Sequence, residues 1–144
     1  MTSITRSALV MHSAEQMYNL VNDVESYPQF LPGCTATEII SKTEEELVAS
    51  LTISKVGVNQ TFTTRNILQF PDRMELSLVD GPFERFVGVW HFLRLSDEAC
   101  KVTYDMDFEV NSGLAGVALG AVFKQMASMM VDSFVQRAKQ VYGS

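Results

Sequence analysis

Hydrophobic and polar residues alternate with a period of two through most of residues 34–110. The alternation is clearest over residues 100–110, where the odd positions are polar and the even positions are Cys100, Val102, Tyr104, Met106, Phe108 and Val110. Such a pattern predicts a strand that is buried on one face and exposed to solvent on the other. Similar patterns, separated by polar or Gly/Pro-containing turns, predict further strands over residues 34–42, 46–55, 60–70, 73–79 and 85–95.

The N-terminal residues predict a strand followed by a helix. Residues 2–11 are expected to form the strand. Ser13 is then followed by Gln16 at the spacing of a capping box, and apolar residues recur at helical intervals up to Val24. The helix is expected to end near Tyr27-Pro28, because proline disfavours helical geometry in the residue before it.

The C-terminal residues predict one long helix. Residues 113–142 contain no proline and would span about 45 Å at 1.5 Å per residue. The first part, residues 113–123, carries no charge but is too short to cross a bilayer. The second part is amphipathic, with apolar residues at helical spacing. The helix therefore needs apolar cover from the sheet, a ligand, a partner or a lipid surface.

The connections between the predicted strands are short, as at residues 42–45, 56–59 and 96–99. Short connections favour antiparallel pairing of sequential strands, because parallel neighbours need long crossovers. The chain has 144 residues, which is the size of one domain. We therefore expect a single α+β domain over residues 1–144, with a curved antiparallel sheet of about seven strands closed by the long helix.

Composition favours a compact fold and disfavours a broad contact with nucleic acid. The chain is 47% hydrophobic and 19% charged, which is too apolar for a disordered protein. Its formal net charge of −6 opposes contact with phosphate backbones, so no specific DNA binding is expected. The N-terminus lacks the apolar stretch and cleavage site of a secretory signal, which predicts a cytoplasmic protein.

The residues that usually carry catalysis show no recognisable arrangement. Cys34 and Cys100 lack the spacing of a zinc or redox site and are expected to be reduced core or pocket residues. Neither His12 nor His91 is spaced from other potential ligands as in a known metal site. His91 is expected on the solvent-exposed face of its strand. The acidic side chains at residues 44–46 and on the last strand are interpreted as solvated. We expect neither an enzyme nor a catalytic metal or cofactor.

The most informative segment runs from Val79 to Phe92. Large apolar side chains occupy alternate positions at Phe86, Trp90 and Phe92, and Gly88 interrupts the row. A missing side chain among rings either lets a neighbouring element approach closely or leaves space for a ligand. Two interpretations stay open: plain packing of the helix on the sheet, or an apolar pocket beneath the helix, whose methionine-rich wall could adapt to a ligand.

The element order and several local motifs resemble the coenzyme Q-binding protein family of the START-like, or polyketide cyclase-like, superfamily. The motifs that carry the resemblance are Arg6-Ser7-Ala8-Leu9-Val10, Ser13-Ala14-Glu15-Gln16-Met17-Tyr18, the run over residues 24–34, Phe62-Thr63-Thr64-Arg65-Asn66, and Val79-Asp80-Gly81-Pro82-Phe83 with Trp90 and Phe92. The resemblance covers essentially the whole chain. It implies the helix-grip fold, in which the last helix lies across a curved sheet and an apolar cavity opens between them.

The resemblance implies two activities of different kinds. One is non-catalytic binding of ubiquinone or a similar isoprenoid quinone, which would support cellular respiration. The other is attachment to the large ribosomal subunit, which would block its joining to the small subunit and inhibit translation initiation. Glu84, where the family pattern has a basic residue, weakens a basic docking patch, and the apolar residues 113–123 favour lipid contact.

The quinone activity would need a pocket of roughly 300–1,000 Å³. The residues expected to line it come from the aromatic strands and the long helix: Phe86, Gly88, Trp90, Phe92, Tyr104, Met106, Val122, Met126 and Met129. A second set is expected to contact a tail at the pocket mouth or a membrane surface: Leu114, Val117, Ala118 and Ala121. Such contact would place the protein transiently at the inner membrane.

Overall fold

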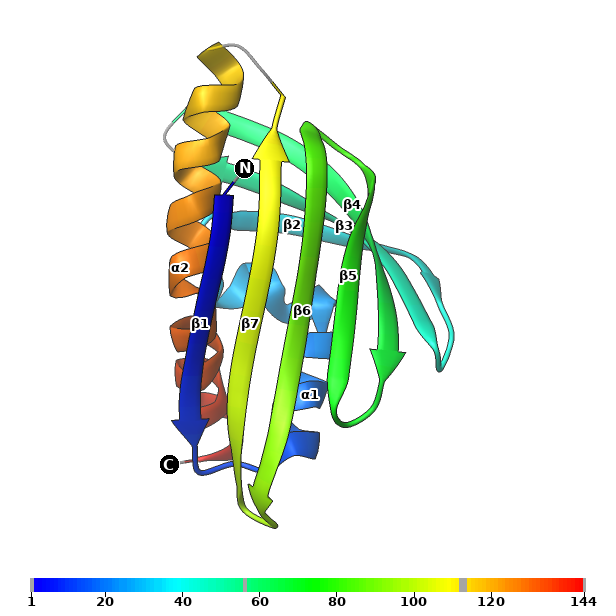
Figure 1. Cartoon of the computed structure of the whole chain (residues 1–144), viewed down its shortest axis with the longest axis vertical. Helices are drawn as coiled ribbons and strands as arrows, with labels where there is room; N and C mark the ends of the chain where they lie inside the picture. Colours follow the sequence, from blue (N-terminus) through cyan, green and yellow to red (C-terminus); the bar gives the residue numbers. More distant parts are fainter. Residues whose placement is uncertain (1, 56, 112–113, 144) are drawn as a thin grey trace.

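The computed structural model describes residues 2–55, 57–111 and 114–143, with residues 114–116 described by their backbone only. The elements follow one another as predicted, with a strand, a short helical region, six strands and a long helix (Figure 1). Their bounds are β1 Thr2–Val10, α1 Ala14–Asn22, the 3₁₀ helix η1 Val24–Gln29, β2 Cys34–Lys42, β3 Glu46–Lys55, β4 Val58–Gln69, β5 Arg73–Asp80, β6 Phe83–Ser96, β7 Ala99–Val110 and α2 Leu114–Tyr142.

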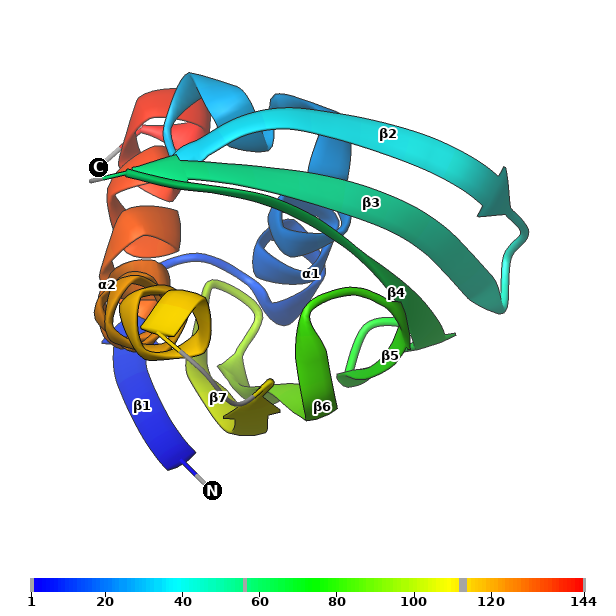
Figure 2. The same ribbon diagram turned by 90° about the horizontal axis from the view of Figure 1, so that it is seen from above.

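The strands form one antiparallel sheet in the order β1-β7-β6-β5-β4-β3-β2. Strands β2 to β7 pair sequentially, which confirms the predicted meander. β1 pairs with β7 in a register that sets Thr2 opposite Phe108 and Val10 opposite Cys100. The sheet curves, and α2, α1 and η1 occupy its concave side (Figure 2). The predicted α+β helix-grip architecture is therefore confirmed.

The first helix is shorter than predicted. α1 ends at Asn22, and Asp23 leaves helical geometry with φ −84° and ψ 68°. The chain then continues as η1, which contains Pro28 instead of ending before it. The tighter turn begins where Ser26 Oγ donates a hydrogen bond to Asp23 Oδ2 over 2.6 Å, a local bond that competes with the helical pattern. At the other end, the predicted capping box of Ser13 and Gln16 is present.

Aromatic rings from β6, β7 and α2 form the centre of the core. The rings of Trp90 and Tyr104 stack with centroids 4.3 Å apart, and Phe134 of α2 meets Trp90 edge-on at 5.3 Å. Toward the other end of α2, the ring of Phe123 lies 4.9 Å from that of Phe83 and 5.0 Å from that of Phe108. These contacts hold α2 against the concave face of the sheet, and a small internal space remains between them.

Candidate functional site

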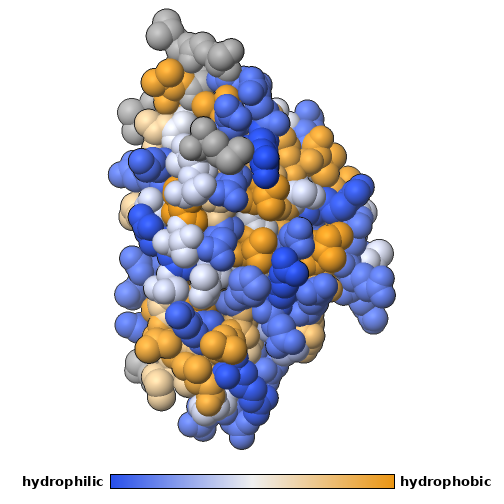
Figure 3. All heavy atoms as spheres, viewed as in Figure 1, coloured by the Kyte–Doolittle hydropathy of each residue, from blue (hydrophilic) through white to orange (hydrophobic). Residues whose placement is uncertain are grey.

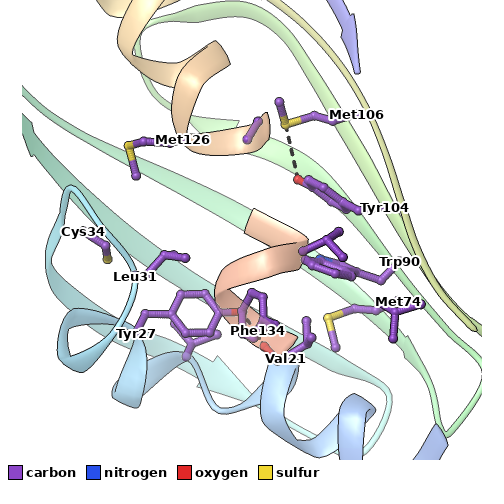
Figure 4. Close-up of a cluster of buried hydrophobic side chains, with 14 of the residues drawn as sticks. Val21, Tyr27, Leu31, Cys34, Met74, Trp90, Tyr104, Met106, Met126 and Phe134 are labelled. Carbon is purple, nitrogen blue, oxygen red and sulfur yellow. Dashed lines mark hydrogen bonds between the residues drawn. The ribbon is translucent and has the colours of Figure 1, made fainter. Parts of the chain in front are cut away.

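A small apolar cavity lies between the sheet, α2 and η1. Its volume is about 50 Å³, against the roughly 30 Å³ that a water molecule occupies in the liquid. Figure 4 shows how side chains from η1, β6, β7 and α2 converge on this region of the core. The lining residues are Val24, Tyr27, Leu31, Cys34, Leu51, Ile53, Phe62, Thr64, Asn66, Leu76, Phe86, Trp90, Tyr104, Phe123, Met126, Ala127 and Met130.

Helical periodicity explains the contribution of α2 to the cavity. Phe123, Met126, Ala127 and Met130 all line it, and their spacings of three, four and seven residues place them on one helix face. On the sheet side, alternate residues of each strand face inward. Phe86 and Trp90 of β6 both face inward in this way. The two periodicities together direct rings and thioethers into the same space.

One wall of the cavity combines a flexible side chain with a glycine. Gly33, in the turn before β2, has a positive φ of 87°, and the sulfur of Met126 lies 2.9 Å from the place that a Cβ at this residue would occupy. Only glycine fits here without displacing the methionine. Since methionine is unbranched and polarizable, this wall can change shape at low cost.

The polar groups of the cavity are few. Tyr27 Oη donates a hydrogen bond to the backbone oxygen of Val21, and Tyr104 Oη donates one to the sulfur of Met106 over 3.3 Å (Figure 4). Thr64 Oγ1 donates to Asn66 Oδ1 over 2.9 Å. Burial raises the pKa of the Cys34 thiol to about 11, which keeps it neutral near pH 7. The cavity is therefore uncharged.

Four of the predicted lining residues reach the cavity: Phe86, Trp90, Tyr104 and Met126. Four others are buried but lie elsewhere in the core: Gly88, Phe92, Met106 and Val122. At Gly88 the missing side chain lets a neighbouring residue approach closely and does not leave space for a ligand, because the Tyr104 ring fills the space that a side chain would take. Phe92 packs instead toward α1, with its ring 5.6 Å from that of Tyr18.

The predicted position of Met129 is wrong. Its side chain is 42% exposed on the outer surface of α2, and Met130 lines the cavity in its place. The two residues lie about 100° apart around the helix, and Met130 is the one that continues the stripe from Met126.

The predicted mouth residues lie on the outside of α2. Val117 is 72% exposed, and Ala118 and Ala121 are exposed as well. Val117 and Ala121 border a shallow groove that also includes Lys124 and Thr2. The side chain of Leu114 lies outside the described residues. Contact of this surface with lipid stays a prediction.

Sequence reasoning missed the contribution of η1 and the turn after it. Val24, Tyr27, Leu31 and Cys34 line the cavity because η1 and the start of β2 close the side that the sheet leaves open. It also missed Thr64 and Asn66, which are only 2% and 4% exposed. The available signal was that Thr64 and Asn66 follow Phe62 at alternate, inward positions of one strand.

The residues considered for catalysis are not assembled into a site. In the described ranges, no three His, Cys, Asp or Glu side chains are placed to hold a metal ion. His91 is exposed, and His12 Nε2 lies 2.8 Å from the backbone oxygen of Gly143. Cys34 and Cys100 are free and buried, as predicted. Nor does any helix of the described part of the chain have both the length and the hydropathy needed to cross a membrane.

An exposed apolar patch lies on the convex face of the sheet. Leu9 and Leu93 both stand opposite Lys101 in the strand register, and Met11 and Leu95 extend the patch toward the ends of β1 and β6. Each of these four apolar side chains, here called the convex patch, is between 54% and 78% exposed. Figure 3 shows hydrophobic atoms gathered over the lower ends of β1, β6 and β7.

The basic residues of α2 do not form a free cationic surface. Arg137 Nη2 donates to Gln29 Oε1 over 2.9 Å, and the guanidinium lies 5.1 Å from the centre of the Phe30 ring. Lys124 and Lys139 are exposed on α2, with Asp132 between them in sequence. A surface of this kind is a weak partner for phosphate groups.

The fold and cavity define a helix-grip protein with an apolar interior. A family model described as polyketide cyclase / dehydrase and lipid transport matches residues 10–135. The chain belongs to this family, as the sequence resemblance predicted.

The curated relatives include proteins with different names. The chain is 50% identical over 144 residues to the ribosome association toxin RatA of Escherichia coli (strain K12), covering 100% of this chain and 91% of the relative. It is 25% identical over 143 residues to the mitochondrial coenzyme Q-binding protein COQ10 of Drosophila melanogaster, covering 96% of this chain and 59% of the relative.

Solved structures share the fold. The Zhui aromatase/cyclase from Streptomyces sp. R1128 has a TM-score of 0.84 at 17% identity, covering 96% of this chain and 94% of that chain. A START superfamily protein from Mycobacterium smegmatis has a TM-score of 0.80 at 19% identity, covering 96% and 98%. At these identities the likeness establishes the architecture and leaves the activity open.

Proposed function

We propose that the protein associates with the large ribosomal subunit, blocks its joining to the small subunit and so inhibits translation initiation. The observation that carries this proposal is the 50% identity over 144 residues with a protein named ribosome association toxin. This role does not require the cavity, which has a volume of about 50 Å³. The protein acts by occupying a surface, without catalysis.

The convex patch is the surface that suits this role best. A net charge of −6 opposes contact through ribosomal phosphates, and Arg137 is held by Gln29 and Phe30. The four exposed apolar side chains of the convex patch, with Lys101 among them, suit docking on a ribosomal protein. We therefore propose that β1, β6 and β7 face the subunit.

Sedimentation tests the proposal directly. Purified protein is mixed with separated bacterial ribosomal subunits and run through a sucrose gradient under conditions that allow joining. We expect the protein in the large-subunit fractions and a smaller peak of joined ribosomes. A protein that stays at the top of the gradient, with the joined peak unchanged, would overturn the proposal.

We propose a second, separate activity for the cavity, which is to hold an apolar molecule, with ubiquinone or a similar isoprenoid quinone as the expected ligand. Its wall is apolar over most of its area, and Met126 and Met130 give it room to adapt. A ligand would have to widen the cavity, and a long tail would extend past the exposed Val117, Ala118 and Ala121 of α2 toward a membrane surface.

Mass spectrometry of an organic extract from freshly purified protein tests this second activity. We expect an isoprenoid quinone in an amount comparable to that of the protein. A variant in which Ala127→Val fills part of the cavity serves as the control. An extract without lipid, together with no response of the Trp90 fluorescence to added short-chain quinone, would contradict it.

A further inference from the structure

The inward face of β4 carries two adjacent polar side chains in the cavity wall. Thr64 and Asn66 follow Phe62 at alternate positions, and all three line the cavity. Thr64 is 2% exposed and Asn66 is 4% exposed. Burial of a hydroxyl and an amide costs free energy unless each finds a hydrogen-bond partner. Their presence in an otherwise apolar wall therefore needs a physical reason.

The hydrogen bond between the two residues orients the amide. Thr64 Oγ1 donates to Asn66 Oδ1 over 2.9 Å, so the oxygen of the amide is engaged by its neighbour on the strand. The Nδ2 group, with its two hydrogens, is then the free end of the side chain. None of the hydrogen bonds formed among the described residues has this Nδ2 group as its donor.

The surrounding polar groups do not hydrogen-bond to the nitrogen of this amide. Tyr27 Oη and Tyr104 Oη donate to Val21 and Met106, and among the described residues neither hydroxyl oxygen is hydrogen-bonded to the amide. The remaining lining side chains are apolar or a neutral thiol. An oxygen from a bound molecule would complete the arrangement. No charged residue is among the described residues of the lining, so this oxygen should belong to a neutral group, since a buried carboxylate would lack a counter-charge.

We propose that the Asn66 amide is the recognition group of the cavity and donates a hydrogen bond to the carbonyl oxygen of a neutral, otherwise apolar ligand. Thr64 is the positioning residue, because it holds the amide oxygen and turns the nitrogen inward. The inference rests on the second activity proposed above and adds to it a selection rule: neutral esters and ketones are accepted, and carboxylates of the same length are refused.

The test compares a neutral ester with the carboxylate that has the same acyl chain. Methyl octanoate and octanoate are titrated separately into the purified protein near neutral pH. Binding is followed by the fluorescence of Trp90, the single tryptophan of the chain and a cavity residue. The side-chain amide signal of Asn66 is followed in parallel by nitrogen-proton correlation spectra. We expect the ester to bind at least about tenfold more tightly and to shift the Asn66 signal downfield.

Two variants separate recognition from shape. Asn66→Leu keeps the branched shape but removes the donor, and should weaken ester binding about tenfold, the size of one buried hydrogen bond. If the leucine side chain disturbs folding, Asn66→Ala also removes the donor and should weaken ester binding in the same way. Arg65→Gln, on the outward face of the same strand, is the matched control and should leave ester binding unchanged.

The outcomes distinguish the two levels of the proposal. If neither molecule perturbs Trp90, ligand binding by the cavity is wrong. If both bind equally, or if the Asn66 variants bind the ester like the wild type, the cavity binds ligands but Asn66 does not select them. Ester selectivity that is lost in the Asn66 variants and kept in Arg65→Gln supports the proposal.

Discussion

The ring of Tyr104 lies over the backbone of Gly88. Its hydroxyl oxygen is 2.9 Å from the place that a Cβ at Gly88 would occupy, and two of its ring carbons are within 3.4 Å. The two residues are on neighbouring strands, with Trp90 paired directly opposite Tyr104. The glycine therefore allows the stacking of Tyr104 on Trp90 that fills the centre of the core.

Gly88→Ala should destabilise the protein by about 1–3 kcal/mol, because the new methyl group displaces a ring that is packed on all sides. The free energy of unfolding from urea titration measures the change. Gly120→Ala is the control, since its new Cβ would meet only Val110 at ordinary contact distances of 3.5 and 3.8 Å. That change should be neutral or stabilising by up to about 1 kcal/mol. Equal effects of the two substitutions would contradict the steric role of Gly88.

Stability should fall as the pH rises from about 9 toward 11. Burial raises the pKa of the Cys34 and Cys100 thiols from 9.0 to about 11 in the folded protein. The folded state therefore keeps protons that the unfolded state releases in this range, so the stabilisation is complete below pH 9 and is lost as pH passes the folded pKa.

Urea unfolding at intervals between about pH 8 and about pH 10 checks this expectation, since tyrosines of the unfolded chain contribute mainly above that range. The double substitution Cys34→Ala and Cys100→Ala should reduce the slope of stability against pH, whatever it does to stability itself. A slope that is the same in both proteins would show that the thiols do not cause it.

Ala127→Val should separate the two proposed activities. Ala127 lines the cavity and is 1% exposed, so two added methyl groups would occupy much of its free space. We expect a change in unfolding free energy within about 1 kcal/mol and a loss of the Trp90 response to apolar ligands. Sedimentation with the large ribosomal subunit should stay at the wild-type level. Loss of both properties would mean that they depend on one another.

Leu93→Asp and Leu95→Asp should weaken sedimentation with the large subunit by more than about tenfold, because each places a charge in the proposed docking surface. Both side chains are more than half exposed, so the effect on folding should stay within about 0.5 kcal/mol. Ile40→Asp is the matched control, since Ile40 is 57% exposed but lies on β2, at the opposite edge of the sheet. An equal effect at all three positions would exclude the convex patch as the specific contact.

The architecture was predictable because the strands are buried on one face only. From Cys100 to Val110 in β7 every inward residue is hydrophobic and every outward residue is polar or charged, which makes the period of two visible without any tertiary information. The end of α1 was not predictable in the same way. It depends on a side-chain bond between Ser26 and Asp23 that competes with helical hydrogen bonding, and proline gave a misleading signal.

The candidate site was predictable only on the elements with strong periodicity. Phe86, Trp90 and Tyr104 followed from strand alternation, whereas Met129 and Met130 are consecutive on α2 and the pattern did not decide which one faces inward. The volume of the cavity was beyond sequence reasoning. The cavity is the space that side chains from the strands, α2 and η1 leave unfilled. Its volume therefore depends on the rotamer of each of these side chains.

The pairing of β1 with β7 sets an order of events during synthesis. Residues 2–10 meet their partners only at residues 100–108, so the sheet edge cannot close until most of the polypeptide exists. Contacts so distant in sequence carry a large loop-closure entropy and form late. A nascent chain emerging N-terminus first must therefore hold its first strand unpaired until translation has nearly finished. A polypeptide that ends before β7 leaves the backbone groups of β1 without the strand that pairs with them.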